Sequence, residues 1–137
     1  MRLTRFTDNA LRCLIYLGRA GDRVVTIGEV ASRMAMSEDH LLKVVRRLVD
    51  LGYVNTLRGR RGGVRLAQLP AQIVVGDVIR STEDNLAIVP CFNPGDVSCP
   101  LTSDCALARA LDEALGAFFA VLQQRTLADL IRVKGQA

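Results

Sequence analysis

Two short helix patterns joined by a tight break, and followed directly by a glycine-rich hairpin pattern, constrain the fold of this chain most strongly. Thr26 precedes apolar residues at helical spacing over 27–34, and Ser37 precedes a second such run over 38–51 that stops at Gly52. Ser and Thr are preferred at helix N-caps, so each run has a start signal. The pattern predicts a helix-turn-helix, in which the second helix enters the major groove of DNA.

The residues after Gly52 predict a β-hairpin attached to this pair of helices. Residues 53–57 and 64–66 have strand character, and residues 58–63 between them hold three glycines that permit a tight turn. A hairpin in this position is a wing, and its basic tip suits phosphate or the minor groove. A merely solvated basic loop is the weaker interpretation, because the helix-turn-helix predicts a wing here. The arginines of the tip are Arg58, Arg60 and Arg61.

Helical periodicity recurs through the remainder of the chain. It predicts helices over 4–17, 73–83, 106–124 and 127–133, and a short strand or coil over 85–90. Only 4% of the residues are aromatic while 50% are hydrophobic, so the core must consist of Leu, Val, Ile and Ala, which suits helices. We therefore expect a mainly α fold: a winged helix-turn-helix with a small β-hairpin wing and a long C-terminal dimerisation helix.

The helix predicted over 106–124 carries an apolar stripe that suits pairing with another helix. In a chain of this size the stripe can meet its own copy across a two-fold axis, which also suits a palindromic DNA site. Packing wholly within one protomer is the alternative, and the sequence leaves it open. The stripe consists of Leu107, Leu111, Leu115, Phe118 and Leu122.

Charge divides the 137 residues into a basic front and a mildly acidic back. Residues 1–70 hold 13 Lys and Arg against 6 Asp and Glu, and residues 71–137 hold 5 against 8. The basic part is therefore expected to meet a polyanion. We expect one domain over 1–137, with a DNA-binding module at 1–70 and a cysteine loop and dimerisation helix at 71–137.

Three of the four cysteines lie in one turn-rich segment, at the spacing C-x7-C-x5-C. No apolar stretch approaches the roughly 20 residues of a membrane span, and no leader peptide is apparent, so a cytoplasmic location is expected, without membrane association. Clustered cysteines in a reducing compartment are more often metal ligands or redox groups than disulfides. The spacing disfavours structural zinc and favours an iron–sulfur cluster over a thiol redox switch or unligated thiols. These residues are Cys91, Cys99 and Cys105, whereas Cys13 has apolar neighbours and is interpreted as a small buried thiol.

Nothing in the sequence favours an enzyme. There are no paired carboxylates, no nucleophile beside a base and no phosphate-cradling loop, because the glycine-rich turn at 58–63 lacks the Lys-Ser/Thr ending of a P-loop.

Four motifs together resemble the small winged-helix regulators of the Rrf2 family. They are MRLT with FTD at 1–8, the wing over 54–66, the cysteine triplet with Pro-Leu after its second member, and LADL at 127–130. The triplet is similar to that of cluster-binding members, and the likeness is strongest to nitric-oxide-sensing repressors and next to iron-responsive regulators. It implies a homodimeric repressor with an iron–sulfur cluster, 4Fe-4S favoured over 2Fe-2S, that loses operator binding when the cluster is nitrosylated or lost. A cluster carrier or electron-transfer protein is the remaining alternative.

The resemblance also implies site residues. Some relatives use a histidine shortly after the third cysteine, but residues 106–110 contain none. We hypothesise that Asp8 of the other protomer is the fourth ligand, through a displaceable carboxylate oxygen. The alternative is that Asp8 only stabilises the first turn of its helix through the helix dipole. DNA contacts are expected from Ser37, His40, Lys43 and Arg46 on the second helix of the helix-turn-helix, and from Arg58, Arg60 and Arg61 on the wing.

Overall fold

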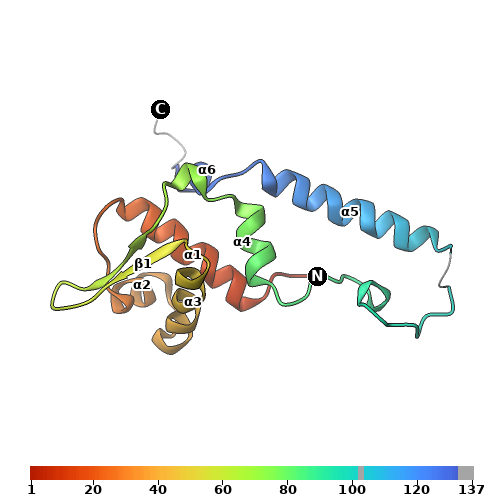
Figure 1. Ribbon diagram of the computed structural model, residues 1–137, viewed down its shortest axis with the longest axis horizontal. Coiled ribbons are helices and arrows are strands. Elements are labelled where there is room, and N and C mark those ends of the chain that lie inside the picture. The colour runs from red at the N-terminus through yellow and green to blue at the C-terminus, as the bar shows by residue number, and fades with distance from the viewer. Residues whose placement is uncertain (102–103, 133–137) are drawn as a thin grey trace.

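The structure is a computed structural model that describes residues 1–101 and 104–132. Figure 1 shows a mainly helical fold with one hairpin, as predicted. In chain order the elements are α1 (Arg5–Ala20), α2 (Ile27–Met34), α3 (Glu38–Asp50), β1 (Val54–Leu57), β2 (Gly63–Leu66), the 3-10 turn η1 (Pro70–Gln72), α4 (Val75–Thr82), the 3-10 turn η2 (Pro90–Phe92), α5 (Ala106–Gln123) and α6 (Leu127–Ile131). The segment 85–90 is coil apart from the start of η2. The helix predicted over 127–133 ends at Ile131, since Arg132 is extended, and residue 133 lies outside the described residues.

Side-chain caps mark the starts of the first three helices, and two of them, Thr26 and Ser37, were predicted from the sequence. The side chains of Thr4, Thr26 and Ser37 each accept a hydrogen bond from a backbone N–H in the first turn of α1, α2 and α3. These caps satisfy donors that a helix leaves free at its N-terminus, which is why each helix begins where it does.

Helix α1 lies at the centre of the packing. It contacts α2, α3, α4 and α6, and its buried face includes Cys13, Leu14 and Leu17. Val30 of α2 and Leu48 of α3 belong to the same buried cluster. The core is therefore aliphatic, as the composition indicated.

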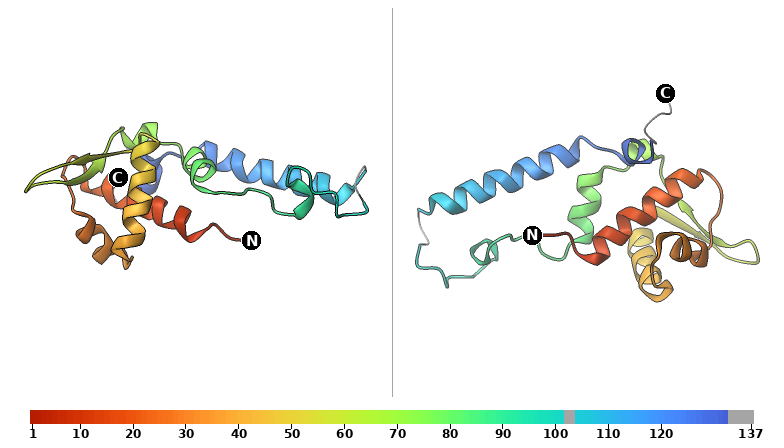
Figure 2. Two further views of the ribbon diagram at one scale, coloured as in Figure 1. Left: turned by 60° about the horizontal axis from the view of Figure 1, so that its bottom comes forward. Right: turned by 180° about the vertical axis from the view of Figure 1, so that it is seen from behind.

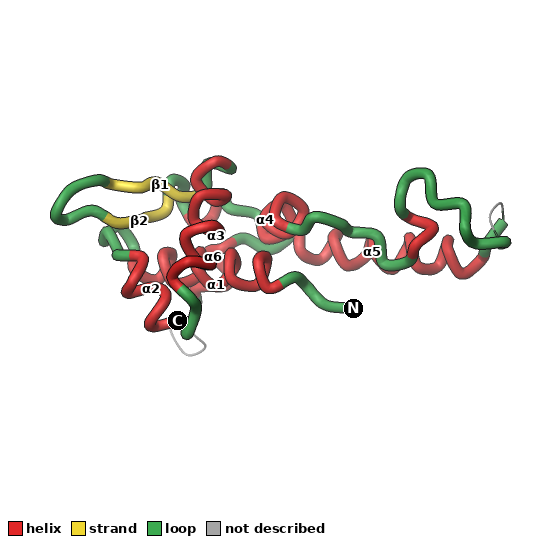
Figure 3. Tube along the Cα trace, turned by 90° about the horizontal axis from the view of Figure 1, so that it is seen from below, coloured by secondary structure: helices red, strands yellow, loops and turns green. Residues whose placement is uncertain are grey.

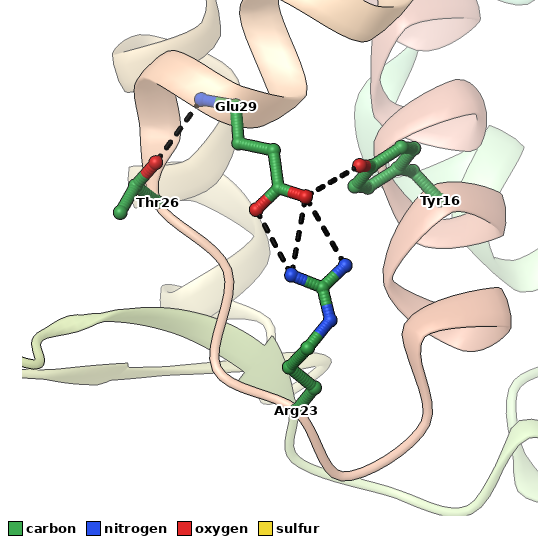
Figure 4. Close-up of polar contacts among 4 residues, drawn as sticks. All are labelled: Tyr16, Arg23, Thr26 and Glu29. Carbon is green, nitrogen blue, oxygen red and sulfur yellow. Dashed lines mark hydrogen bonds and ion pairs between the residues drawn. The ribbon is translucent and has the colours of Figure 1, made fainter.

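A polar cluster fixes α2 against α1 at the protein surface (Figure 4). The Tyr16 hydroxyl donates to Glu29 at 2.9 Å, and the Arg23 guanidinium donates to both oxygens of the same carboxylate at 3.1 Å. The hydrogen bonds from Arg23 and then Tyr16 lower the pKa of Glu29. The ionised carboxylate thereby joins the loop before α2 to both helices of the contact.

The wing is a two-stranded antiparallel hairpin whose register pairs Val54 with Leu66. Val25, in the segment before α2, also exchanges backbone hydrogen bonds with Val64 of β2, at 2.9 and 2.7 Å. Gly63 permits this approach, since a Cβ there would collide with the Val25 carbonyl oxygen. The base of the wing is thus attached to the helix-turn-helix.

Helix α5 extends away from the remainder of the molecule, and the C-terminal part of α5 contacts α4 (Figures 1 and 2). Phe119 is the one α5 residue that is fully buried; it packs with Val75 and Ile79 of α4, and the Arg80 guanidinium carbon lies 3.7 Å from the Phe119 ring centroid. Phe119 was not in the predicted stripe. Leu115 and Leu122, which pack in the same cluster, did belong to the predicted stripe. The residues of α5 that face α4 thus form one edge of an apolar face that is broader than the stripe.

No helix in the described parts of the chain has the length and apolar character needed to cross a membrane.

Candidate functional site

The exposed face of α3 carries the side chains expected to read DNA. Lys43 and Arg46 are exposed, one turn apart on the helix, and Ser37 is exposed at its N-cap. The opposite face of α3 is buried in the core through Leu41, Val44, Val45 and Leu48. The same helix thus presents a fixed, partly cationic surface.

Leu42 lies on this exposed face and was not predicted from the sequence. Its side chain is 38% exposed, beside Lys43. An apolar side chain on a groove-reading helix suits contact with a thymine methyl group. The periodicity contains the signal, because burying Leu41, Val44 and Val45 turns Leu42 outward.

His40 has a different environment from the other residues expected to contact DNA. Its ring lies edge-on to the Phe6 ring of α1, with the centroids 6.1 Å apart. The Nε2 atom is buried and has no hydrogen-bond partner within the described residues. The structure thus places His40 between α3 and the first turn of α1, and a contact of His40 with DNA stays a prediction.

The wing tip presents its three arginines to solvent. Arg58, Arg60 and Arg61 are all exposed, and the Gly62 N–H closes the turn by donating to the Gly59 carbonyl at 2.9 Å. Gly59 has a φ of 104°, in the region that favours glycine. Figure 3 shows the hairpin at one end of the molecule and the loop beside the start of α5 at the other.

The cysteine segment is irregular in the described residues between α4 and α5, apart from η2. Cys91 is exposed within η2, and Cys99 and Cys105 are partly exposed; all three thiols are free. Cys105 is the residue directly before α5, so the segment is joined to the long helix. Within the described residues, no three His, Cys, Asp or Glu side chains lie together in a way that could hold a metal ion.

Asp8 lies in the first turn of α1, in an ion pair with Arg12 of the next turn. The Asp8 Oδ2 atom is 3.1 Å from Arg12 Nε, and both side chains are about half exposed, at 49% and 53%. Asp8 is therefore accessible from outside the protomer, although one described protomer does not gather it with the cysteines.

Comparisons with known proteins agree with this arrangement. The Rrf2 family, described as "Iron-dependent Transcriptional regulator", matches residues 3–133. The chain belongs to the Rrf2 family.

Two proteins that this chain resembles over most of its length share the name NsrR. The HTH-type transcriptional regulator NsrR of Geobacillus kaustophilus is 49% identical over 132 residues, covering 96% of this chain and 90% of that protein. NsrR of Bacillus subtilis is 45% identical over 136 residues, covering 98% and 92%. Among solved structures, T. potens IscR superposes with a TM-score of 0.76 at 25% identity, covering 96% of this chain and 86% of that one.

Membership of the Rrf2 family confirms the winged-helix fold and the resemblance drawn from the sequence motifs. The relatives are transcriptional regulators and not enzymes, so this Rrf2 chain is a transcriptional regulator as well. Winged helices of such regulators bind DNA, which agrees with the exposed cations of α3 and of the wing.

The donor chemistry of this Rrf2 chain fits an iron–sulfur cluster, although its arrangement in one protomer is incomplete. Free thiols are the ligands that such clusters use, and three of them lie within fifteen residues of sequence. A complete ligand set would need the segment to draw its thiols together and a fourth group from elsewhere.

Proposed function

We propose that this protein is an iron–sulfur-dependent DNA-binding repressor that senses nitric oxide and loses operator binding when its cluster is nitrosylated or lost. One observation carries the proposal: three free thiols share one accessible segment of a DNA-binding regulator that is 49% identical to a protein named NsrR. We place it in the cytoplasm, where both DNA and reduced thiols are found.

Cys91, Cys99 and Cys105 would hold the cluster, and Asp8 of a partner protomer would complete the set through a carboxylate oxygen. When bound, the cluster, 4Fe-4S rather than 2Fe-2S, supplies iron that reacts with nitric oxide. Asp8 supports this role by being accessible, since its side chain is 49% exposed, and it would exchange its ion pair with Arg12 for the iron. A weak oxygen ligand among thiolates leaves one position that a signal molecule can reach.

A homodimer would supply that partner residue. Helix α5 leaves apolar side chains uncovered, among them Leu107, Phe118 and Val121 at 64%, 36% and 58% exposure. Beside this face lies a hollow of about 570 Å³ lined by Leu3, Leu86 and Phe118, among other residues. A second copy that covers this surface would present two wing-bearing modules, which suits a palindromic operator.

In this proposal, DNA is contacted by α3 and by the wing. Ser37, Lys43 and Arg46 would contact the major groove, and Arg58, Arg60 and Arg61 of the wing would contact phosphates or the minor groove. His40 can contact DNA only if its ring leaves Phe6. We propose that Leu42 adds an apolar contact to a base edge.

Anaerobic gel shifts test the proposal. The protein, reconstituted with iron and sulfide, is mixed with a duplex that it has selected from a random library, with and without a nitric oxide donor. We expect binding by the reconstituted protein and its loss with the donor. Equal binding by cluster-free, reconstituted and nitric-oxide-treated protein would overturn the sensing mechanism, and binding without strong salt dependence would favour a cluster carrier or electron-transfer protein.

An iron-responsive regulator is the second candidate, because the Rrf2 family is described as iron-dependent. Titrating the reconstituted protein with an iron chelator and with nitric oxide separates the two. Release of DNA at substoichiometric nitric oxide, with the chelator ineffective over the same time, supports the nitric oxide sensor; the reverse order supports the iron sensor.

A further inference from the structure

The last turn of α4 and Glu83 directly after it lie at a junction of three parts of the molecule. The chain passes from Glu83 into the residues that lead to Cys91, and Asn85 Nδ2 donates to Asn93 Oδ1 of the cysteine segment at 2.9 Å. The coil that leaves this turn is therefore held to the cysteine segment by a side-chain hydrogen bond at Asn85, two residues after Glu83.

Glu83 holds the start of α1. Its Oε1 atom accepts from the backbone N–H of Thr4 at 2.8 Å and from the Thr4 hydroxyl at 3.0 Å. Thr4 is the N-cap of α1, so Glu83 adds a carboxylate to the positive end of that helix. Burial opposes ionisation of Glu83, but hydrogen bonds from Thr7 and Thr4 outweigh it and lower its pKa. The contact is consequently charge-assisted at neutral pH.

Arg47 holds the recognition helix α3 to the same turn. Its guanidinium donates to the Ser81 carbonyl at 3.1 Å, 34 residues away in sequence. Carbonyls in the last turn of a helix lack intrahelical partners and attract cations, so Ser81 is a suitable acceptor. Arg47 is thereby engaged with α4, in contrast to its neighbour Arg46 on the groove-reading face.

We infer that Arg47 and Glu83 are positioning residues that transmit the state of the cysteine segment to the recognition helix and to α1. The inference rests on the proposed function, since it presupposes that the cysteine segment changes state with its ligand. A displacement of the residues leading to Cys91 would move the last turn of α4. Because that turn holds α3 through Arg47 and α1 through Glu83, the recognition helix and the helix that it packs against would move with it.

Position between two sites does not itself demonstrate coupling, so the test must measure coupling. Coupling is measured as the ratio of two dissociation constants for the library-selected duplex, that of the cluster-free protein over that of the reconstituted protein. Both constants are measured anaerobically by fluorescence anisotropy. The variants are Arg47→Met, which removes the donor to the Ser81 carbonyl, and Glu83→Gln, which removes the negative charge that strengthens the contact with Thr4. Arg19→Met and Asp22→Asn, both at exposed positions near the end of α1, are the matched controls for the change of charge. The visible absorption of each reconstituted variant verifies cluster content.

Both Arg47→Met and Glu83→Gln should weaken DNA binding by the reconstituted protein and leave the cluster-free protein little changed. The ratio then falls by roughly two- to thirty-fold, the range expected for residues that carry coupling, while the controls keep the wild-type ratio. Arg47→Lys, which retains a donor, should recover part of the wild-type ratio. Equal weakening of both forms would mean a structural or direct DNA-binding role and would overturn the inference, as would an unchanged ratio in either variant. A wild-type ratio of one would instead refute the proposed function.

Discussion

At the scale of single residues, the four cysteines have two different environments. Cys13 is fully buried in α1, and burial raises the pKa of its thiol to about 12, whereas the other three thiols are at least partly exposed. Thiolates are the reactive form, so the buried thiol should be inert. We expect brief alkylation of native cluster-free protein to add three labels by intact-mass measurement, and unfolded protein to add four. Labelling of Cys13 in the native protein, located by peptide mapping, would contradict this.

A second prediction at this scale concerns the polar cluster of Glu29. A carboxyl whose pKa is lowered by folding contributes stability that is fully present above the ordinary glutamate value of about 4.3 and is lost as pH falls through the lowered value. Tyr16→Phe removes one of the two donors to Glu29. The free energy of unfolding in urea should therefore fall at neutral pH, and the difference from wild type should narrow as pH drops below about 4. A difference that does not vary with pH would mean that the hydroxyl acts independently of Glu29 ionisation.

At the scale of elements, the turn of the wing depends on Gly62. A Cβ there would collide with the Leu57 carbonyl oxygen and lie 2.8 Å from that of Gly59, both fixed by the hairpin. Gly62→Ala should lower the free energy of unfolding by about 1–3 kcal/mol through backbone strain. Gly116→Ala is the matched control: a Cβ on that face of α5 meets nothing within 4 Å, so the variant should gain roughly 0.5–1 kcal/mol. Thermal unfolding of both variants checks the two predictions. A change of stability in the same direction for both variants would contradict them.

The wing arginines give a further prediction for this element. Replacing both Arg60 and Arg61 by Gln removes two cations that we propose bind DNA phosphates. The slope of log affinity against log salt should therefore become shallower by about one for each phosphate that the variant no longer binds. Arg19→Gln, on α1, should leave the slope unchanged. An unaltered slope in the wing variant would place the tip away from the DNA.

The elements were largely predictable from sequence, because their signals are local. Thr26 and Ser37 marked the starts of α2 and α3 through their own side chains, and glycines marked the wing turn. Phe119 and the surroundings of His40 depend on which element packs against which face, so periodicity alone did not assign them. The interactions of Arg47 and Glu83 join residues distant in sequence, for which a single chain gives no pattern.

At the scale of the whole molecule, the basic part of the chain and the acidic part lie towards different ends. The basic residues are concentrated in 1–70, which includes α3 and the wing, whereas α5 and the cysteine segment belong to the acidic part. Figure 2 shows α5 and the coil before it extending together from the helix-turn-helix end. DNA is therefore expected at one end only, which leaves the α5 end free for a second copy.

The apolar face of α5 provides the test of that second copy. Val121 is 58% exposed on this face, next to Phe118 one turn earlier, so Val121→Glu would bury a charge in a dimer but leave it in water in a monomer. We expect sedimentation velocity to show a dimer for the wild type and a monomer for Val121→Glu, with unchanged helical circular dichroism and no binding to the library-selected duplex. Ala120→Glu introduces the same charge at an exposed position away from the apolar face and should remain dimeric. A dimeric Val121→Glu variant would exclude α5 as the pairing helix, and with it the delivery of Asp8 to the cysteines of a partner across this contact.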